Sequence, residues 1–393
     1  MQKILIAINS MSVGGIQKAL VNLLKELCEN SQYDITLLLI KKKGDYLNEI
    51  PAGIKVKYAN QWWSLMETSN AEAKGKGIKY WFARSFFALL IKVGRRDLAT
   101  TILAFSQKKL KGYDVAISYR QPDIATNVIG GTAEFVRKCC QARKKVIFIH
   151  CDYSLYGGNC DYNNKQLEKF DQIAVVSNGC IKKLLQCVPE LRKKVVCVYN
   201  CQDYEDVIKK SEQNPVNYSL KTPTIVSVSR LSAEKGIERA LRVFARLKKE
   251  NLNFEWHIIG DGEEKEALRS LAMEQGLSKN LIFEGNTTNP YRYMKNADIF
   301  FLPSYHEAAP MVIGEALCLG IPILTTDTSS AYELVGTHGI VCTNTEEGIE
   351  NGLRTMIGQF PNNHDVYFSD SIEEKSLGNI EALKQFEIIC KLK

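Results

Sequence analysis

The feature that most constrains the fold of this chain is a repeated alternation of short apolar runs with helical patterns. Residues 3–8 form an apolar run of strand length, a loop with Gly14 and Gly15 follows, and apolar residues then recur at helical spacing as far as Leu27. A second strand pattern lies at 35–40. Strand, glycine loop, helix and strand in this order predict a βαβ unit with parallel strands.

Further patterns extend this alternation and divide it into two series. The first series continues with strand patterns at 115–118, 146–149, 173–176 and 195–199; the second has strand patterns at 224–229, 254–259, 281–284, 299–302 and 322–325 and helical patterns at 236–249, 263–275 and 311–319. The chain between the series, near 200–220, is polar. The sequence therefore predicts an α/β protein of two doubly wound, Rossmann-like domains.

The length of 393 residues also favours two domains, because a single hydrophobic core seldom grows so large. We expect an N-terminal domain over 1–200, a C-terminal domain over 201–375, and a last helix over 376–393 that packs back towards the first domain. The hydrophobic content of 45% is that of a folded protein. The net charge of +7 is compatible with phosphates or an anionic membrane face as partners, and it does not require nucleic acid.

The cysteines and the N-terminal run bear on the expected compartment. Twelve cysteines are scattered in apolar contexts without a Cys-x-x-Cys pair, which favours reduced core residues of a cytoplasmic protein. The first apolar run stops at Asn9, as in a strand rather than a signal peptide. No window approaches the roughly 18 apolar residues of a membrane-spanning helix. We expect a cytoplasmic protein that is soluble or peripheral at the inner face of the cell membrane.

Segment 76–110 departs from the alternating pattern because it has two apolar faces. One stripe at helical spacing consists of Phe82, Phe86, Leu89, Leu90 and Val93, and the opposite face carries Tyr80, Phe87 and Ile91. Lysines and arginines surround both faces. A helix of this kind can pack on its own domain with one face and contact an anionic membrane with the other. Alternatively, it is buried between elements of the N-terminal domain.

Two stretches of the second series carry residues suited to chemistry. Arg230 follows a strand and Lys235 precedes a helix, so that two cations at the carboxyl edge of the sheet can bind a diphosphate. Glu307 lies in a strand-to-helix loop and Glu315 follows eight residues later, in a helix whose positive end faces the same edge. The alternative interpretation is that these are surface salt bridges and solvated acids. The chain has no Asp-x-Asp pair to hold a divalent metal, so we expect neither a metal nor a cofactor.

Taken together, these stretches resemble the retaining glycosyltransferase family 4, the group 1 glycosyltransferases of the GT-B fold. The resemblance is carried by Arg230…Lys235-Gly236, Gly260-Asp-Gly262, Phe283-Glu-Gly285, the run 297–304, Glu307-x7-Glu315 and Gly320-Ile-Pro322. It is strongest over 224–327 and weaker in the first 40 residues. It implies two Rossmann-like domains that face each other across a cleft.

The resemblance also implies a role for each matching residue. It implies that Arg230 and Lys235 bind the donor diphosphate, that Glu307 meets the transferred sugar and that Glu315 binds the ribose. The remaining donor contacts implied are the backbone from Ala309 through Pro310 and Met311 to Val312, the glycine loop at Gly14 and Gly15, and a histidine at the donor sugar, here His150. The loop Ala308-Ala309-Pro310 departs from the common pattern of the family, which leaves the sugar open.

The function implied by the resemblance is retaining, metal-independent transfer of a sugar. The expected donor is a nucleotide-sugar, in particular a UDP-sugar, and the expected acceptor is a glycan or a polyprenyl-linked saccharide in cell-surface polysaccharide biosynthesis. Two alternatives on the same fold are a nucleotide-sugar epimerase, which needs no acceptor, and a non-catalytic partner subunit. A dinucleotide-dependent dehydrogenase is disfavoured because no Gly-x-Gly-x-x-Gly follows the first strand.

Overall fold

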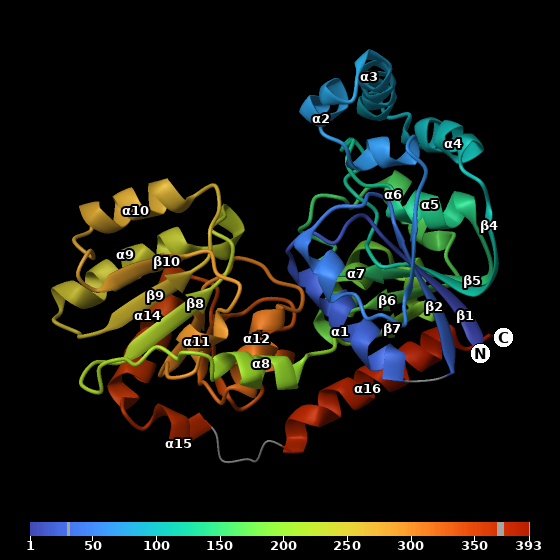
Figure 1. Ribbon diagram of the computed structural model, residues 1–393. Helices are drawn as coiled ribbons and strands as arrows, with labels where there is room; N and C mark the ends of the chain where they lie inside the picture. Colours follow the sequence, from blue (N-terminus) through green and yellow to red (C-terminus); the bar gives the residue numbers. More distant parts are fainter. Residues whose placement is uncertain (30–31, 368–372, 393) are drawn as a thin grey trace. The chain divides into compact units, whose positions relative to one another are not determined.

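The protein consists of two compact units, each built on one parallel sheet (Figure 1). The computed structural model describes residues 1–29, 32–367 and 373–392. Unit 1 comprises residues 1–201 together with the chain from Asn379 on, and unit 2 comprises Gln202–Gly378. The predicted fold class, two doubly wound α/β domains, is confirmed.

Unit 1 contains a seven-stranded sheet in the order β3-β2-β1-β4-β5-β6-β7. Its strands are β1 (Gln2–Ile8), β2 (Tyr33–Leu39), β3 (Lys55–Tyr58), β4 (Leu110–Ser118), β5 (Cys140–Ile149), β6 (Gln172–Val175) and β7 (Val195–Cys197). Its helices are α1 (Gly15–Glu29), α2 (Asn70–Gly75), α3 (Ile78–Lys92), α4 (Arg96–Ser106), α5 (Thr132–Cys139), α6 (Asp161–Glu168), α7 (Asn178–Cys187) and most of α16 (Glu373–Cys390), with short 3-10 turns η1 (Asp45–Glu49), η2 (Trp63–Glu67) and η3 (Pro189–Lys193).

The core of unit 1 lies on both faces of its sheet. Ile4, Ile6 and Ile8 of β1 are fully buried on the face that α1 and α16 cover. The alternating residues Leu5 and Ala7 are fully buried as well, because a parallel sheet is covered on both sides. Helix α16 brings Phe386 into this core. The chain therefore ends within the unit in which it begins.

Unit 2 contains a six-stranded parallel sheet in the order β10-β9-β8-β11-β12-β13. Its strands are β8 (Thr224–Val228), β9 (Glu255–Ile259), β10 (Leu281–Gly285), β11 (Ile299–Leu302), β12 (Ile323–Thr326) and β13 (Gly339–Cys342). Its helices are α8 (Tyr204–Ser211), α9 (Ile237–Lys249), α10 (Lys265–Glu274), α11 (Tyr291–Met294), α12 (Met311–Cys318), α13 (Ala331–Val335), α14 (Glu346–Gln359) and α15 (Asn363–Tyr367), with the 3-10 turn η4 (Ala233–Lys235).

Two strands were not predicted, and both lie at an edge of their sheet. Strand β3, with the sequence Lys-Val-Lys-Tyr, is mostly exposed, and three of the four residues of β13 are only partly buried. An edge strand with few buried residues has no long apolar run, so its sequence signal is weak.

Each sheet has one point at which the strand order reverses. In unit 1 the chain runs from β1 outwards to β2 and β3 and then returns to β4 on the other side of β1. In unit 2 it runs from β8 to β9 and β10 and returns to β11 beside β8. We call these the switch points. Ligands of open α/β sheets bind at such points, beyond the carboxyl ends of the strands.

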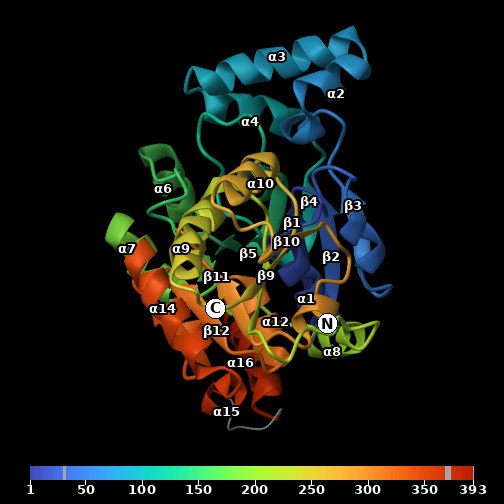
Figure 2. The same ribbon diagram turned by 90° about the vertical axis from the view of Figure 1, so that its left-hand side faces the viewer.

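Helices α3 and α4 lie outside the sheet layers, with α3 passing over α4 in Figure 2. Phe87 and Ile91 of α3 are buried, whereas Phe82, Leu89 and Val93 are 59%, 62% and 61% exposed. The interpretation that α3 is buried between other elements is therefore wrong for the stripe that contains Phe82. Among the described residues, no helix combines the length and apolar character needed to cross a membrane.

The twelve cysteines are all free thiols, and seven of them are buried. Burial raises the pKa of Cys139 to about 11 and that of Cys140 to about 12. A thiol with so high a pKa stays protonated and is a poor nucleophile. These two adjacent residues are therefore part of the core and are not a reactive pair.

Candidate functional site

The loops that follow β8 and β11 meet at the switch point of unit 2. Lys235 is the last residue of η4, after β8, and Glu307 lies in the loop after β11. Lys235 Nζ lies 2.6 Å from Glu307 Oε1, and the two side chains are 17% and 10% exposed. The sequence placed both residues at this edge, and the structure joins them in one ion pair.

The two loops also contact each other through the backbone. Tyr305 N–H donates to the carbonyl oxygen of Glu234 at 2.9 Å. Gly236 has a φ of +64°, and a Cβ added there would lie 2.2 Å from the carbonyl oxygen of Pro303. Only glycine allows this close approach without strain. Ser304 Oγ donates to Glu307 Oε1 at 2.7 Å, which fixes the carboxylate that Lys235 contacts.

Arg239 of α9 holds the loop after β11 in place. It is 2% exposed, and its Nη2 donates to the carbonyl oxygens of Pro303 at 2.7 Å and Ser304 at 2.9 Å. Its guanidinium also lies over the Tyr305 ring, 3.9 Å from the centroid. Arg239 was not among the predicted site residues. The available signal was a cation among the apolar residues of the first turn of α9.

Arg230 and Lys235 form ion pairs with different glutamates. The Arg230 side chain is 76% exposed, and its Nη2 lies 3.1 Å from Glu234 Oε1. The two predicted cations thus lie beside the same switch point, Arg230 at the surface and Lys235 in a nearly buried ion pair. An exposed guanidinium with a single weak partner is free to reorient towards an anion.

Helix α12 begins at the same edge because it follows the loop after β11. Pro310 occupies the position before its first residue, Met311, where the predicted helical pattern 311–319 also begins. Ala309 and Val312 on either side are partly buried. Glu315 is 5% exposed in the second turn of the helix, so that little of its side chain faces solvent. The positive end of the helix dipole points beyond the sheet edge.

The other predicted residues belong to unit 1. Gly15 is the first residue of α1 and Gly14 precedes it, after β1. A Cβ added at Gly14 would meet only the end of the Gln17 side chain, at 2.8 Å, so the fold itself tolerates a side chain there. Packing therefore does not require a glycine at this position.

His150 directly follows β5, and its imidazole is uncharged. Burial and the nearby Arg120 lower the pKa of His150 to about 3. The ring stacks on Phe148, with centroids 5.5 Å apart. Its Nε2 is shielded from solvent and has no hydrogen-bond partner among the residues that the structure describes. A neutral imidazole of this kind can form a hydrogen bond to a ligand but does not act as an acid near neutral pH.

A polar cluster that the sequence analysis missed lies at the switch point of unit 1. Asn9, directly after β1, donates through Nδ2 to Glu67 Oε1 at 2.5 Å and accepts from the Thr132 hydroxyl. After β4, Arg120 Nη2 lies 3.0 Å from Asp123 Oδ1. Asn9 directly follows one predicted strand and Arg120 lies two residues after another, which is a usable signal. Glu67 lies in η2, far from either strand in the sequence, and no local pattern predicts its place in the cluster.

The carboxyl group of Glu67 has an unusual pKa. Burial and the negative charge of Asp123 raise the pKa of Glu67 to about 7, although Arg120, Lys41 and the hydrogen bond from Asn9 act in the opposite direction. The protonated and ionised forms of Glu67 are therefore both populated near neutral pH.

Comparison with known proteins finds a family match within the second unit. Residues 208–364 match the family described as "Glycosyl transferases group 1". This segment is similar to the group 1 glycosyltransferases. It contains the ion pair of Lys235 and Glu307 together with Arg230, Arg239 and Glu315.

Curated relatives of this chain carry related names. An uncharacterized glycosyltransferase of Haemophilus influenzae is 31% identical over 156 residues, which is 39% of this chain and 43% of the relative. The O-antigen biosynthesis glycosyltransferase WbnH of Escherichia coli is 28% identical over 229 residues, which is 55% of this chain and 63% of the relative. The chain thus matches about half of the length of these relatives.

Solved structures extend the likeness to both units. HepE from Anabaena, in complex with UDP, has a TM-score of 0.63 at 16% sequence identity, over 99% of this chain and 98% of HepE. The likeness at this identity concerns the fold. Both parallel sheets of the chain therefore correspond to the GT-B architecture that the motifs implied.

Proposed function

We propose that this protein transfers a sugar from a nucleotide-sugar, in particular a UDP-sugar, to a glycan or lipid-linked acceptor in cell-surface polysaccharide biosynthesis. The ion pair of Lys235 and Glu307 at the switch point of a group 1 glycosyltransferase domain carries this proposal. The UDP bound to HepE supports a uridine nucleotide, and the name of WbnH supports a polysaccharide acceptor.

In the proposed complex, positive charge at the switch point receives the donor diphosphate. Lys235 would exchange part of its contact with Glu307 for a phosphate oxygen, and the exposed Arg230 would turn to the same anion. The N-terminus of α12 adds its dipole. We propose that these groups, rather than a divalent metal, stabilise the charge of the leaving group.

The proposed reaction retains the configuration of the sugar. The bond between the anomeric carbon and the phosphate oxygen breaks, and the diphosphate leaves with the electron pair. The acceptor hydroxyl then bonds to the anomeric carbon on the same face and gives its proton to the departing phosphate oxygen. Glu307 would hold the hydroxyls of the sugar, Glu315 those of the ribose, and the neutral His150 would offer a hydrogen bond to the sugar.

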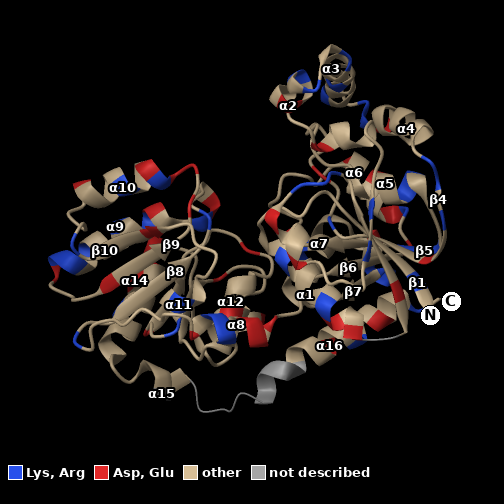
Figure 3. Ribbon diagram, viewed as in Figure 1, with Lys and Arg blue, Asp and Glu red and all other residues tan. Residues whose placement is uncertain are grey.

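The surface of α3 and α4 supports a peripheral contact of this protein with an anionic membrane. Between residues 73 and 108 the chain has eight Lys and Arg residues, of which Arg96 is buried, and one acidic residue, Asp97. Figure 3 shows Lys and Arg in blue on α2 and α3. Asp97 is itself paired with Arg137 at 2.8 Å. Exposed apolar side chains within a basic surface fit an interface that contains anionic lipids.

The first experiment tests transfer with a panel of nucleotide-sugars and a lipid extract as acceptor. Labelled sugar should enter the lipid or glycan fraction with at least one donor, and chelation of divalent metals should leave the rate unchanged. Lys235→Ala should lower the rate by about 10²–10³-fold, because one preorganised contact to the leaving group is lost. Glu315→Ala should abolish transfer without unfolding the protein.

Lys295→Ala provides the matched control. Lys295 forms an ion pair with Glu212 at 2.7 Å in the same unit, but it precedes β11 and so lies at the opposite edge of the sheet. The rate of sugar transfer by Lys295→Ala should equal that of the unmodified protein. Conversion of the donor without an acceptor would indicate an epimerase, and tight donor binding without turnover would indicate a non-catalytic subunit. Full activity of Lys235→Ala would refute the assignment of the site.

A further inference from the structure

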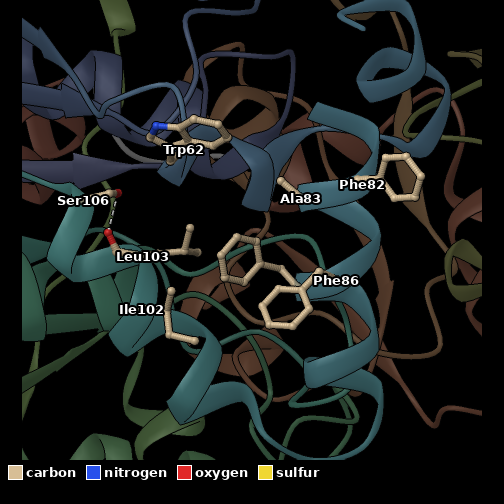
Figure 4. Close-up of a pocket in the computed structure, with 8 residues that line it drawn as sticks. Trp62, Phe82, Ala83, Phe86, Ile102, Leu103 and Ser106 are labelled. Carbon is tan, nitrogen blue, oxygen red and sulfur yellow. Dashed lines mark hydrogen bonds between the residues drawn. The ribbon is translucent and has the colours of Figure 1, made fainter. Parts of the chain in front are cut away.

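A groove in unit 1 is not used by the proposed transfer. It lies between α3 and α4, has a volume of about 570 Å³ and is walled by Phe82, Phe86 and Phe87 of α3, Ile102 and Ser106 of α4, and Trp62 (Figure 4). This volume lies within the range of small-molecule sites. The one hydroxyl of the wall, on Ser106, already donates to the carbonyl oxygen of Leu103 at 2.7 Å. The groove therefore offers almost no hydrogen-bonding capacity to a ligand.

The walls of the groove are held before any ligand binds. The indole of Trp62 stacks on Tyr80, with centroids 5.4 Å apart and planes at 14°. Phe87 is buried and contacts Phe86 edge-on, with centroids 5.5 Å apart. Rigid aromatic walls lose little conformational entropy when a ligand enters.

The surroundings of the groove indicate where its ligand comes from. Outside its lining, the same two helices carry exposed apolar side chains: Leu89 of α3 is 62% exposed and Phe105 of α4 is 87% exposed. Exposed lysines and arginines flank it, at Lys79, Lys92 and Arg95 among others. Several exposed apolar side chains gathered on two neighbouring helices mark an interaction site. The charge of the rim selects an anionic partner.

We infer that this groove takes one hydrocarbon chain of an anionic membrane lipid. A peptide segment would bring N–H and C=O groups that the walls cannot satisfy, at a cost of about 1–3 kcal/mol each. A hydrocarbon chain brings none, and each buried CH₂ contributes about 0.8 kcal/mol. The lipid phosphate would meet the lysines of the rim. This inference rests on the proposed membrane contact and adds to it a defined site for a single chain.

The test uses phosphatidylglycerol vesicles whose acyl chains carry bromine, which quenches nearby tryptophans. The measurements are made in a Trp81→Phe background. Of the remaining tryptophans, Trp63 and Trp256 are fully buried, so Trp62 reports on the groove. Vesicles should quench the bound protein, and Trp62→Phe should remove that quenching. Ala83→Phe, which fills the groove from α3, should also remove it while binding to vesicles persists.

Two further variants keep the test decisive. Ser106→Phe fills the groove from α4 and should remove the quenching as Ala83→Phe does. The same result from two different helices would show that filling the groove, and not a disturbance of one helix, is the cause. Leu89→Ser lies outside the groove and should weaken sedimentation with vesicles without changing the quenching of the bound fraction. Vesicle binding with no quenching, or quenching that survives both filled grooves, would overturn the inference. No binding to anionic vesicles at all would instead overturn the membrane contact on which it rests.

Discussion

Each unit holds the loop at its switch point with one buried arginine, and the two arginines have different partners. Arg239 of unit 2 donates to the carbonyl oxygens of Pro303 and Ser304, in the loop after β11. Arg96 of unit 1 donates to the carbonyl oxygen of Asn127, in the long loop after β4. In addition, Arg96 Nε lies 2.6 Å from Glu134 Oε1, and both side chains are only 1% exposed.

The difference separates a role in stability from a role in positioning. In unit 1 two buried charges depend on each other, so the removal of either leaves the other without compensation. In unit 2 the charge of Arg239 is shared among carbonyl dipoles and the Tyr305 ring, and its position decides where the loop with Glu307 lies. We therefore expect substitutions of Arg96 to affect mainly the free energy of unfolding and those of Arg239 mainly the rate of transfer.

The largest effect is expected for Arg96→Met. It leaves the Glu134 carboxylate buried without its partner, which should lower the free energy of unfolding of unit 1 by about 3–5 kcal/mol. Urea unfolding followed by circular dichroism measures this loss. Because the protein has two units, the transition of unit 1 must be resolved from that of unit 2.

Two variants test the cause of this loss. Replacing both partners, in Arg96→Met with Glu134→Leu, should restore much of the stability because neither charge of this pair remains buried without the other. Arg143→Ala removes an exposed arginine, 66% accessible and 3.6 Å from Asp114, and should change the free energy of unfolding by less than about 1 kcal/mol. Equal stability of Arg96→Met and Arg143→Ala would contradict the comparison.

A smaller effect, on rate rather than stability, is expected for Arg239→Lys. Lysine keeps the charge but lacks the planar fork that contacts two carbonyl oxygens at once. The loop that carries Glu307 should shift, and turnover should fall by about 10–100-fold, the order of loss caused by a displacement of about 1 Å. Arg242→Lys, on the same helix but 42% exposed, should have normal turnover. If both variants are equally active, Arg239 does not position the site.

The two arginines also show where prediction from the sequence stops. Lys235 and Glu307 were predicted because each lies in a short motif whose strand and loop are readable from local pattern. The role of Arg239 depends on the carbonyl oxygen of Pro303, 64 residues further along the chain. The sequence around Arg239 does not predict this contact. The alternation of apolar runs predicted both sheets, since burial on two faces leaves a strong signal. The edge strands and the position of Glu67 depend on tertiary contacts, which leave no signal in the local sequence.

The smallest effect concerns the raised pKa of Glu67. Between its usual pKa of 4.5 and its folded pKa of about 7, the folded protein keeps a proton that the unfolded chain has lost. Relative to Glu67→Gln, the free energy of unfolding should therefore fall as pH rises from about 5 to 7, by no more than about 1.4 kcal/mol per pH unit, and level off above. Urea unfolding of both proteins across this range measures the difference. Glu72 provides the opposite control, because the hydrogen bond from Lys41 lowers the pKa of Glu72 to about 2. Any stability that Glu72 contributes is therefore lost only below pH 4.5. The difference curve for Glu72→Gln should be flat between about pH 5 and pH 7. A flat curve for Glu67→Gln as well would show that the switch point of unit 1 holds an ordinary carboxylate.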